Sequence, residues 1–352
     1  MKLGGTTNTL VLYRASFLLD KSLSEIMEDI MKIKKILGLM LAMTLLGSCG
    51  NKANETEKST GEGSSDKAKI GIVQIADHPS LDAAREGFIE KLDSENISYE
   101  LIDHRANGDL ALIPQFATDL KNKDVDLIYT IGTPAAQGVA NTIKDKPVLF
   151  AAVTDPEGAG LSGENITGVS DYVEAGKLID DFLSLYPETK VFGTMYNTNE
   201  QNSQVQIEAL EKALEERGLK LEKQGVSSIN DIPQAIASLK GKIDAMITVT
   251  DNVVVNAMPV ISEALAKENI PSIAYDEGSV ENGALMSEGV NYRELGSQAG
   301  AMAAEILKNG KSAKDIPYER AENLKVLVNT KTAEALGVDL DKDLLKNAEK
   351  ID

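Results

Sequence analysis

From Lys69 onward, short apolar strands alternate with amphipathic helices in an order that occurs twice, and this repetition leaves few folds open. In the first copy, the patterns predict strands at residues 69–75, 98–103, 127–131 and 148–153 and helices at 80–94, 110–122 and 135–143. In the second copy, they predict strands at 190–196, 220–226, 245–249 and 272–275 and helices at 200–217, 232–239 and 254–267. Such alternation is typical of a parallel sheet with helices on both faces.

The two copies also match segment by segment. KIGIVQIADHPSLDAAREGFIEKL corresponds to KVFGTMYNTNEQNSQVQIEALEKAL, VDLIYTIGTPAAQGVA to IDAMITVTDNVVVNA, and KPVLFAAVTD to IPSIAYDEGS. We therefore predict an α/β protein made of two doubly wound parallel-sheet lobes. Open sheets of this kind bind ligands outside the carboxyl ends of their strands, so the two lobes would face each other across a ligand crevice.

Pieces of chain outside the repeat indicate where it passes between the lobes. We place these crossings near Pro187, in 278–289 and in 316–325. The predicted N-terminal lobe is therefore 69–186 plus 284–325, and the predicted C-terminal lobe is 187–283 plus 326–352. A hinge with several crossings allows the crevice to open and close.

The segment before the lone cysteine has the layout of an export signal. Residues 31–48 contain three lysines, a short apolar run and two small residues, and the run is too short to span a bilayer as a helix. Leu46-Gly47-Ser48-Cys49 resembles the lipobox of bacterial lipoproteins, which implies that Cys49 carries acyl chains such as palmitate. We interpret residues 1–30 as an over-long start and 49–68 as the lipidated cysteine and a flexible tether, on the extracytoplasmic face of the cell membrane.

Composition excludes several other classes of function. The chain has a formal net charge of −19, which disfavours a nucleic-acid partner. One cysteine and two histidines cannot build a disulfide framework or a typical zinc site, so we expect no metal and no cofactor. Gly158-Ala-Gly160-Leu-Ser-Gly163 fits a dinucleotide fingerprint, but it does not open a helix after a first strand, so we interpret it as a turn.

A set of motifs resembles the substrate-binding lipoproteins of ABC importers, in the family typified by tryptophan and other aromatic amino-acid binding proteins. These motifs are IVQIADHPSLDAAREGF, IGTPAAQGVA, LFAAVTDPEGAGL, NITGVSD, YNTNEQNS, VTDNVV and AYDEGSVENGAL. The resemblance implies a type I periplasmic-binding-protein fold without catalysis, acting as a monomer. It also implies that a small ligand, with an aromatic amino acid such as tryptophan as first choice, is captured for an ABC permease. A membrane-tethered ligand sensor and a two-lobed α/β enzyme remain the alternatives.

The ligand-binding candidates are the side chains that follow equivalent strands of the two lobes. Thr133 beside Pro134 would meet a carboxylate at a helix start, and Asp155, Asp251 or Asp276 would meet an ammonium group. The same residue types are ordinary helix caps, most of all Ser80 and Ser203. We treat His104 as a surface residue without a partner. The full candidate set is His78, Ser80, Thr133, Pro134, Ala135, Thr154, Asp155, Tyr196, Asn197, Asn202, Thr250, Asp251, Asn252 and Asp276.

Overall fold

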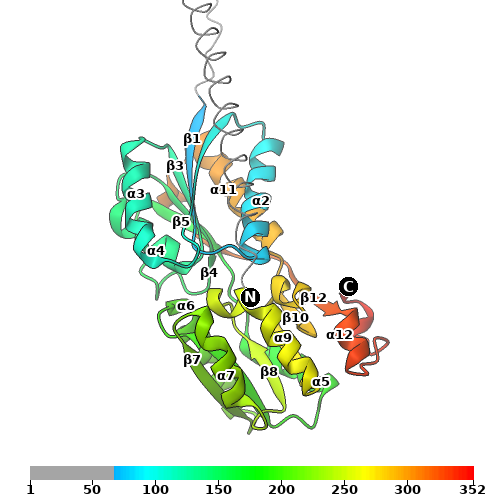
Figure 1. Ribbon diagram of the computed structural model, residues 1–352. Helices are drawn as coiled ribbons and strands as arrows, with labels where there is room; N and C mark the ends of the chain where they lie inside the picture. The colour runs from blue at the N-terminus through cyan, green and yellow to red at the C-terminus, as the bar shows by residue number, and fades with distance from the viewer. Residues whose placement is uncertain (1–66) are drawn as a thin grey trace, which may run out of the picture. The chain divides into compact units, whose positions relative to one another are not determined.

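The computed structural model describes residues 67–352, which form two α/β lobes (Figure 1). The predicted start, export signal and lipidated cysteine, with nearly all of the tether, lie outside the described residues. Within the described part of the chain, no helix is long and apolar enough to cross a membrane.

The N-terminal lobe is a six-stranded sheet in which every neighbouring pair is parallel. Helices α2 (Pro79–Ser94) and α11 (Tyr292–Leu307) cover one face, and α3 (Ile113–Asn122) and α4 (Thr133–Thr142) cover the other (Figure 1). The strands, in sheet order, are β11 (Glu319–Arg320), β5 (Ile166–Ser170), β4 (Val148–Val153), β3 (Leu127–Ile131), β1 (Ala68–Gln74) and β2 (Tyr99–Arg105).

The C-terminal lobe is a seven-stranded sheet with one antiparallel pair, between β10 and β12. The strands, in sheet order, are β13 (Glu349–Ile351), β12 (Leu324–Asn329), β10 (Met286–Val290), β9 (Ser272–Asp276), β8 (Ala245–Thr248), β6 (Val191–Asn197) and β7 (Lys220–Val226). The helices are α5 (Ala175–Leu185), α6 (Gln201–Glu215), α7 (Ile232–Leu239), α8 (Asn252–Asn256), α9 (Met258–Lys267), α10 (Glu277–Glu281), α12 (Thr330–Ala335) and α13 (Asp343–Lys346).

The strand order confirms the predicted repetition. The N-terminal sheet runs β2-β1-β3-β4-β5 and the C-terminal sheet runs β7-β6-β8-β9-β10, so the two lobes share one doubly wound topology. In both, the order reverses between the first and third strands, which creates a crevice at the carboxyl ends of those strands. The lobes differ in the sixth strand, because β11 is parallel to its neighbour and β12 is antiparallel.

The local sequence explains why these elements form. Strand β3 (LIYTI) is buried along its whole length, as expected for a central strand covered on both faces. Proline occupies the first turn of α2, α3, α4, α7 and α9, where its missing N–H leaves no helical hydrogen bond unmade. In the N-terminal core, the Phe88 ring of α2 stacks on Tyr129 of β3 with their centroids 3.9 Å apart. These contacts hold α2 in register over the sheet.

Two of the predicted crossings are wrong. Helix α5 packs on α6 and β9, and β10 pairs with β9, so both elements belong to the C-terminal lobe. The chain therefore crosses at 171–174, before α5, rather than near Pro187. It crosses back at Asn291, after β10, rather than within 278–289. The third crossing lies at 321–323, between β11 and β12. The errors arose because α5 and β10 lie outside the three matched segments, so the repeat did not assign them to a lobe.

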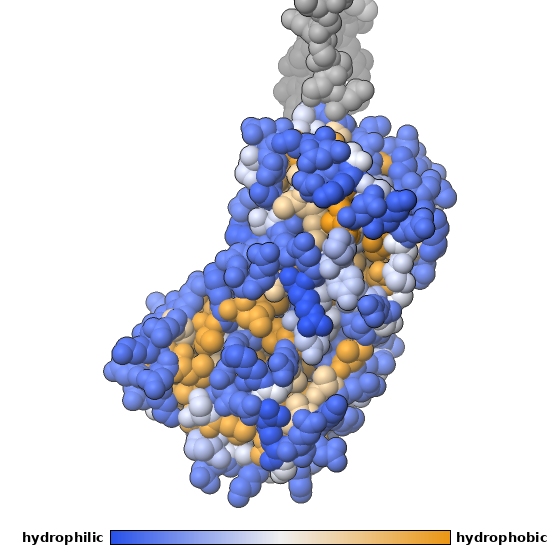
Figure 2. Space-filling model, turned by 180° about the vertical axis from the view of Figure 1, so that it is seen from behind, coloured by the Kyte–Doolittle hydropathy of each residue, from blue (hydrophilic) through white to orange (hydrophobic). Residues whose placement is uncertain are grey.

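The face of the molecule in Figure 2 is mostly hydrophilic, with smaller hydrophobic areas between the hydrophilic side chains. This agrees with the 26% of charged residues in the sequence. Most of the large apolar side chains lie instead in the cores beside the two sheets.

Candidate functional site

A small buried cavity lies between the lobes, at the carboxyl ends of strands from both sheets. Its volume is about 20 Å³, close to the smallest space that holds one water molecule. Residues after β1, β3 and β5, with Ala152 of β4, face residues after β6, β8 and β9 across it. The lining residues are His78, Ser80, Leu81, Gly132, Thr133, Ala152, Asp171, Asn202, Thr250, Asn252, Val255, Asp276 and Tyr292.

Glycine at position 132 brings α4 to this cavity. Gly132 ends the connection from β3 with φ of 96°, a conformation that glycine adopts readily and other residues do not. A Cβ atom there would also overlap the side chain of Ile75 on the neighbouring strand connection. The turn therefore places Thr133 and the first turn of α4 at the crevice, where a helix N-terminus favours negative charge.

Direct hydrogen bonds join the two lobes around the cavity. Ser80 Oγ donates to Asp276 Oδ1 over 2.8 Å, and His78 Nε2 lies 3.3 Å from Asn252 Oδ1. The hydroxyl oxygens of Thr154 and Thr250 lie 3.5 Å apart. A larger hollow of about 470 Å³ opens beside these contacts, again between the lobes, and Asn252 lines both spaces. The lobes are thus closed on each other at the site.

Two buried carboxylates, Asp171 and Asp276, line the cavity. Asp171 accepts hydrogen bonds from Thr154 Oγ1 and from the Tyr292 hydroxyl, each over 2.9 Å, and burial raises the pKa of its carboxyl. Asp276 accepts from the backbone N–H and the hydroxyl of Ser279 as well as from Ser80. The lining residues include no Lys or Arg, so the cavity wall carries negative charge without a cationic partner.

A third buried acid, Glu200, stands behind the cavity at the start of α6. It accepts hydrogen bonds from the side-chain amides of Asn197, Asn202 and Asn252. Burial, and secondarily the neighbouring charge of Asp251, raises the pKa of Glu200 to about 7. Asn202 and Asn252 belong to the cavity wall, so Glu200 acts on the site through them.

Three polar atoms of the lining residues are buried without a hydrogen-bond partner among residues 67–352. They are His78 Nδ1, Thr133 Oγ1 and Asn202 Oδ1. Leaving such a group unpaired in a protein interior costs roughly 1–3 kcal/mol, so three at one cavity mark it as a place for a polar ligand.

The structure brings about half of the predicted candidates to this cavity. His78, Ser80, Thr133, Asn202, Thr250, Asn252 and Asp276 line it, and Thr154 contacts it through Asp171. Pro134 and Ala135 follow Thr133 into α4 and do not line the cavity, and Tyr196 packs half-buried against core side chains. Asn197 faces the larger hollow.

Two of the proposed ammonium partners have other roles. Asp251 caps α8 by accepting from the backbone N–H groups of Val253 and Val254, and it also accepts from Ser203 Oγ. Asp155 accepts from the Gly158 N–H in the glycine-rich turn. Both carboxylates point to backbone donors of their own lobe rather than into the cavity.

The expected roles of two serines and of His104 are corrected. Ser80 Oγ bonds across the lobes to Asp276, and Ser203 Oγ bonds to Asp251, so neither hydroxyl caps its own helix. His104 has a partner, because its Nε2 lies 2.9 Å from Asp119 Oδ2 and its ring stacks on Phe116.

Sequence reasoning missed Asp171, Tyr292 and Glu200. Asp171 directly follows β5, and Tyr292 follows the second crossing, so both lie outside the matched segments. Applying the strand-end rule to the fifth strand as well would have found Asp171. Nothing in the local pattern distinguishes Glu200 from the many exposed acids of the chain.

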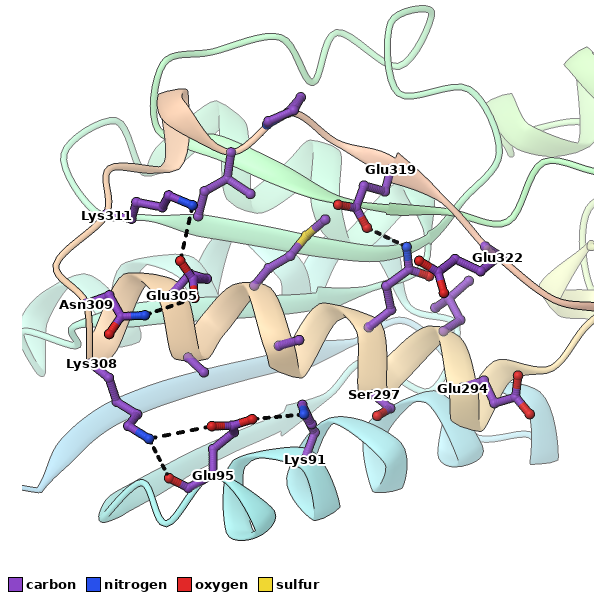
Figure 3. A pocket seen from close by; sticks show the side chains of 18 of the residues that line it. Lys91, Glu95, Glu294, Ser297, Glu305, Lys308, Asn309, Lys311, Glu319 and Glu322 are labelled. Atoms are coloured by element: carbon purple, nitrogen blue, oxygen red, sulfur yellow. Dashed lines mark hydrogen bonds and ion pairs between the residues drawn. The ribbon is translucent and has the colours of Figure 1, made fainter.

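A much larger hollow lies elsewhere in the described part of the chain. A groove of about 670 Å³ runs between α2, α11 and residues 308–323 of the N-terminal lobe (Figure 3). Its lysines are neutralised by neighbouring glutamates, as in the pairs of Lys308 with Glu95 and Lys311 with Glu305. The interlobe cavity, although much smaller, is lined by two buried acids and three unpaired polar atoms, so we take it as the candidate site.

Two matching α/β lobes, three crossings and a polar cavity between the lobes define a binding protein of the type I periplasmic-binding-protein fold. The chain belongs to the ABC transporter substrate binding protein family, whose model matches residues 69–352. These are binding proteins rather than enzymes.

Similar proteins include a tyrosine-binding protein of Clostridioides difficile (strain R20291), 37% identical over 326 residues, or 87% of this chain and 93% of the relative. A solved ABC domain from Streptococcus pneumonia in complex with L-Trp is 32% identical, with a TM-score of 0.77 over 82% of this chain and 100% of that one. A substrate-binding protein with adhesive properties from Clostridium difficile, solved in a ligand-free, open form, is 36% identical. Its TM-score is 0.63 over 81% of this chain and 99% of that one.

The two TM-scores agree with the closed arrangement of the lobes. The open structure is more similar in sequence but superposes less well than the L-Trp complex. Divergence in sequence does not account for this order, and the solved chain with the lower TM-score is the one in a ligand-free, open form. The direct hydrogen bonds from His78 and Ser80 to the opposite lobe also agree with a closed arrangement.

Proposed function

We propose that this protein captures an aromatic amino acid, tyrosine or tryptophan, and delivers it to an ABC permease. The observation that carries this proposal is the interlobe cavity, where a helix N-terminus with an unpaired hydroxyl lies near two buried carboxylates without a cation. The names of the relatives support the ligand class, since one binds tyrosine and another is a complex with L-Trp.

An amino acid carries the two charges that such a cavity would take. We assign its carboxylate to Thr133 and the first turn of α4, where backbone N–H groups favour an anion. We assign its ammonium group to Asp171 and Asp276, because a cation there would offset the carboxylates and favour their charged forms. The apolar side chains of Leu81 and Val255 and the ring of Tyr292 complete the wall.

Ligand capture requires the lobes to separate. A space of about 20 Å³ is far below the roughly 300 Å³ or more of typical small-molecule pockets. Opening would break the Ser80–Asp276 and His78–Asn252 hydrogen bonds, and closing around the ligand would replace them or form them again. A ligand that bridges both lobes stabilises the closed form by its differential affinity for it.

We place the protein on the extracytoplasmic face of the cell membrane, anchored through acylated Cys49. The short apolar run followed by Leu46-Gly47-Ser48-Cys49 supports this, and a soluble lobe pair on a tether suits delivery to a permease. Cell fractionation tests the anchor, since Cys49→Ser should move the protein out of the membrane fraction.

Thermal unfolding of the purified protein with a ligand panel tests the binding function. A ligand at 100 times its dissociation constant should add about 2.7 kcal/mol to the free energy of unfolding. We expect such a rise with L-tyrosine or L-tryptophan and none with glucose or inositol. In Asp171→Asn the rise should shrink, because the ammonium partner loses its charge. A response to sugars alone would contradict the proposal.

A further inference from the structure

Glu200 controls which atoms of the site face the ligand, although it does not line the cavity itself. We propose that Glu200 is a positioning residue that turns hydrogen-bond acceptors toward the ligand, so that the site selects a primary ammonium group. This inference rests on the proposed function for the identity of the ligand. Its first step, the direction of two amide groups, follows from hydrogen-bond chemistry alone.

Asn202 and Asn252 both direct their NH₂ groups toward Glu200. Glu200 Oε2 lies 3.3 Å from Asn202 Nδ2 and 2.5 Å from Asn252 Nδ2, and the Asn252 backbone N–H also donates to it. Above its pKa of about 7 the Glu200 carboxylate is ionised and only accepts, so the donor end of each amide faces it. Asn202 Nδ2 has a second acceptor, the Thr250 carbonyl oxygen, at 2.8 Å. The oxygen of each amide therefore points away from Glu200.

The direction of the Asn252 amide determines the protonation of His78. Asn252 Oδ1 lies 3.3 Å from His78 Nε2, and an amide oxygen can only accept, so Nε2 must carry a proton. Burial lowers the pKa of His78 despite the nearby charges of Asp276, Asp82 and Asp77, so the ring is neutral. A neutral ring with its proton on Nε2 presents Nδ1 as a bare acceptor, and this atom is buried without a partner among the described residues.

The result is a wall of acceptors. Asn202 Oδ1 and His78 Nδ1 join the carboxylates of Asp171 and Asp276 around one cavity. An ammonium group has three donors and no acceptor, so it matches this wall, whereas a ligand without it would leave the acceptors unpaired. Without Glu200, the Asn252 amide could turn over and offer a donor instead, whereas Asn202 Nδ2 would still donate to the Thr250 carbonyl oxygen.

The state of His78 can be measured directly, without any ligand. The chain has two histidines, and His104, bonded to Asp119 and stacked on Phe116, serves as an internal reference. We expect a proton–nitrogen correlation spectrum of the protein with isotope-enriched histidine to show a neutral His78 ring with its proton on Nε2. A proton on Nδ1, or a charged ring at neutral pH, would overturn the inference.

Replacing the carboxylate separates positioning from a merely structural role. In Glu200→Gln, the new NH₂ group can face Asn252 once that amide turns over, which moves the His78 proton to Nδ1. The His104 signals should not change. Glu200→Asp, which keeps the charge, should retain more of the Nε2–H form. Glu263→Gln, at an exposed acid of α9, is the matched control and should alter neither histidine.

Binding of tyrosine and of its analogue without the amino group tests whether the site selects an ammonium group. We expect the wild type to prefer tyrosine, and Glu200→Gln to lower that preference about tenfold or more. An unchanged His78 tautomer together with an unchanged preference in Glu200→Gln would overturn the inference. Failure of the wild type to bind any aromatic amino acid would instead refute the proposed ligand, while the histidine spectra would still decide the role of Glu200.

Discussion

Ala152 shows how a single residue at the cavity departs from relaxed geometry. Its φ is 56°, at a register shift between β4 and β5, and a left-handed conformation costs a non-glycine residue about 1–2 kcal/mol. Ala152→Gly removes this strain, but glycine also gives the unfolded chain more conformational entropy. The net effect should be a rise of about 0.5–1 kcal/mol in the free energy of unfolding. Ala151→Gly, in extended β4, should lower it by about 1 kcal/mol in the same denaturant titration. Equal losses in both variants would contradict strain at Ala152.

At the scale of the elements, α2 and α11 touch backbone to backbone. A Cβ atom on Gly296 of α11 would overlap the Ala84 carbonyl of α2, which cannot move without the helix. Gly296→Ala should thus lower the free energy of unfolding by about 1–3 kcal/mol. Gly176→Ala in α5 is the control, because its Cβ would meet the flexible end of Arg217, and the better helix propensity of alanine should leave stability equal or higher. Similar losses in both would show that close packing of α2 and α11 is not the cause.

At the scale of the whole molecule, buried acids give stability an unusual pH dependence. Burial raises the pKa of Glu200 and of Glu277 to about 7 and raises those of Asp171 and Asp251, whereas unfolded carboxyls titrate near pH 4. Between pH ~4.5 and 7 the folded state therefore binds more protons, and the free energy of unfolding falls as pH rises. The melting temperature should be higher at pH 5.5 than at pH 7.5, and Glu200→Gln should flatten this slope. A melting temperature that rises over this range would contradict the assignment.

The architecture was largely predictable because it follows from local patterns. The spacing of apolar runs predicted the first four strands of each lobe to within a few residues, and the matched segments predicted two lobes of one architecture. Helix α5 and strand β10 were assigned to the wrong lobe, since either sheet offers an apolar surface of the right kind. Which sheet a helix covers depends on the path of the chain through the hinge rather than on its own pattern.

The site was predictable in position and only partly in detail. Rules for strand ends placed His78, Thr133 and Asn252 at the crevice, and the structure brings them together. Asp251 also follows a strand at the crevice, but its carboxylate accepts hydrogen bonds from backbone N–H groups and from Ser203. A cap and a ligand contact have the same local sequence, so the arrangement of the opposite lobe decides between them.

By itself, the sequence determined the two-lobed α/β class, the duplicated architecture and the edge of each sheet at which polar residues gather. It could do so because periodicity and the chemistry of strand ends are local properties of the chain. Only the tertiary structure decided which acids meet across the lobes, which crossings form the hinge and how Glu200 orients its neighbours. Those features depend on distances between residues far apart in the chain, such as Ser80 and Asp276, and no local pattern contains such distances.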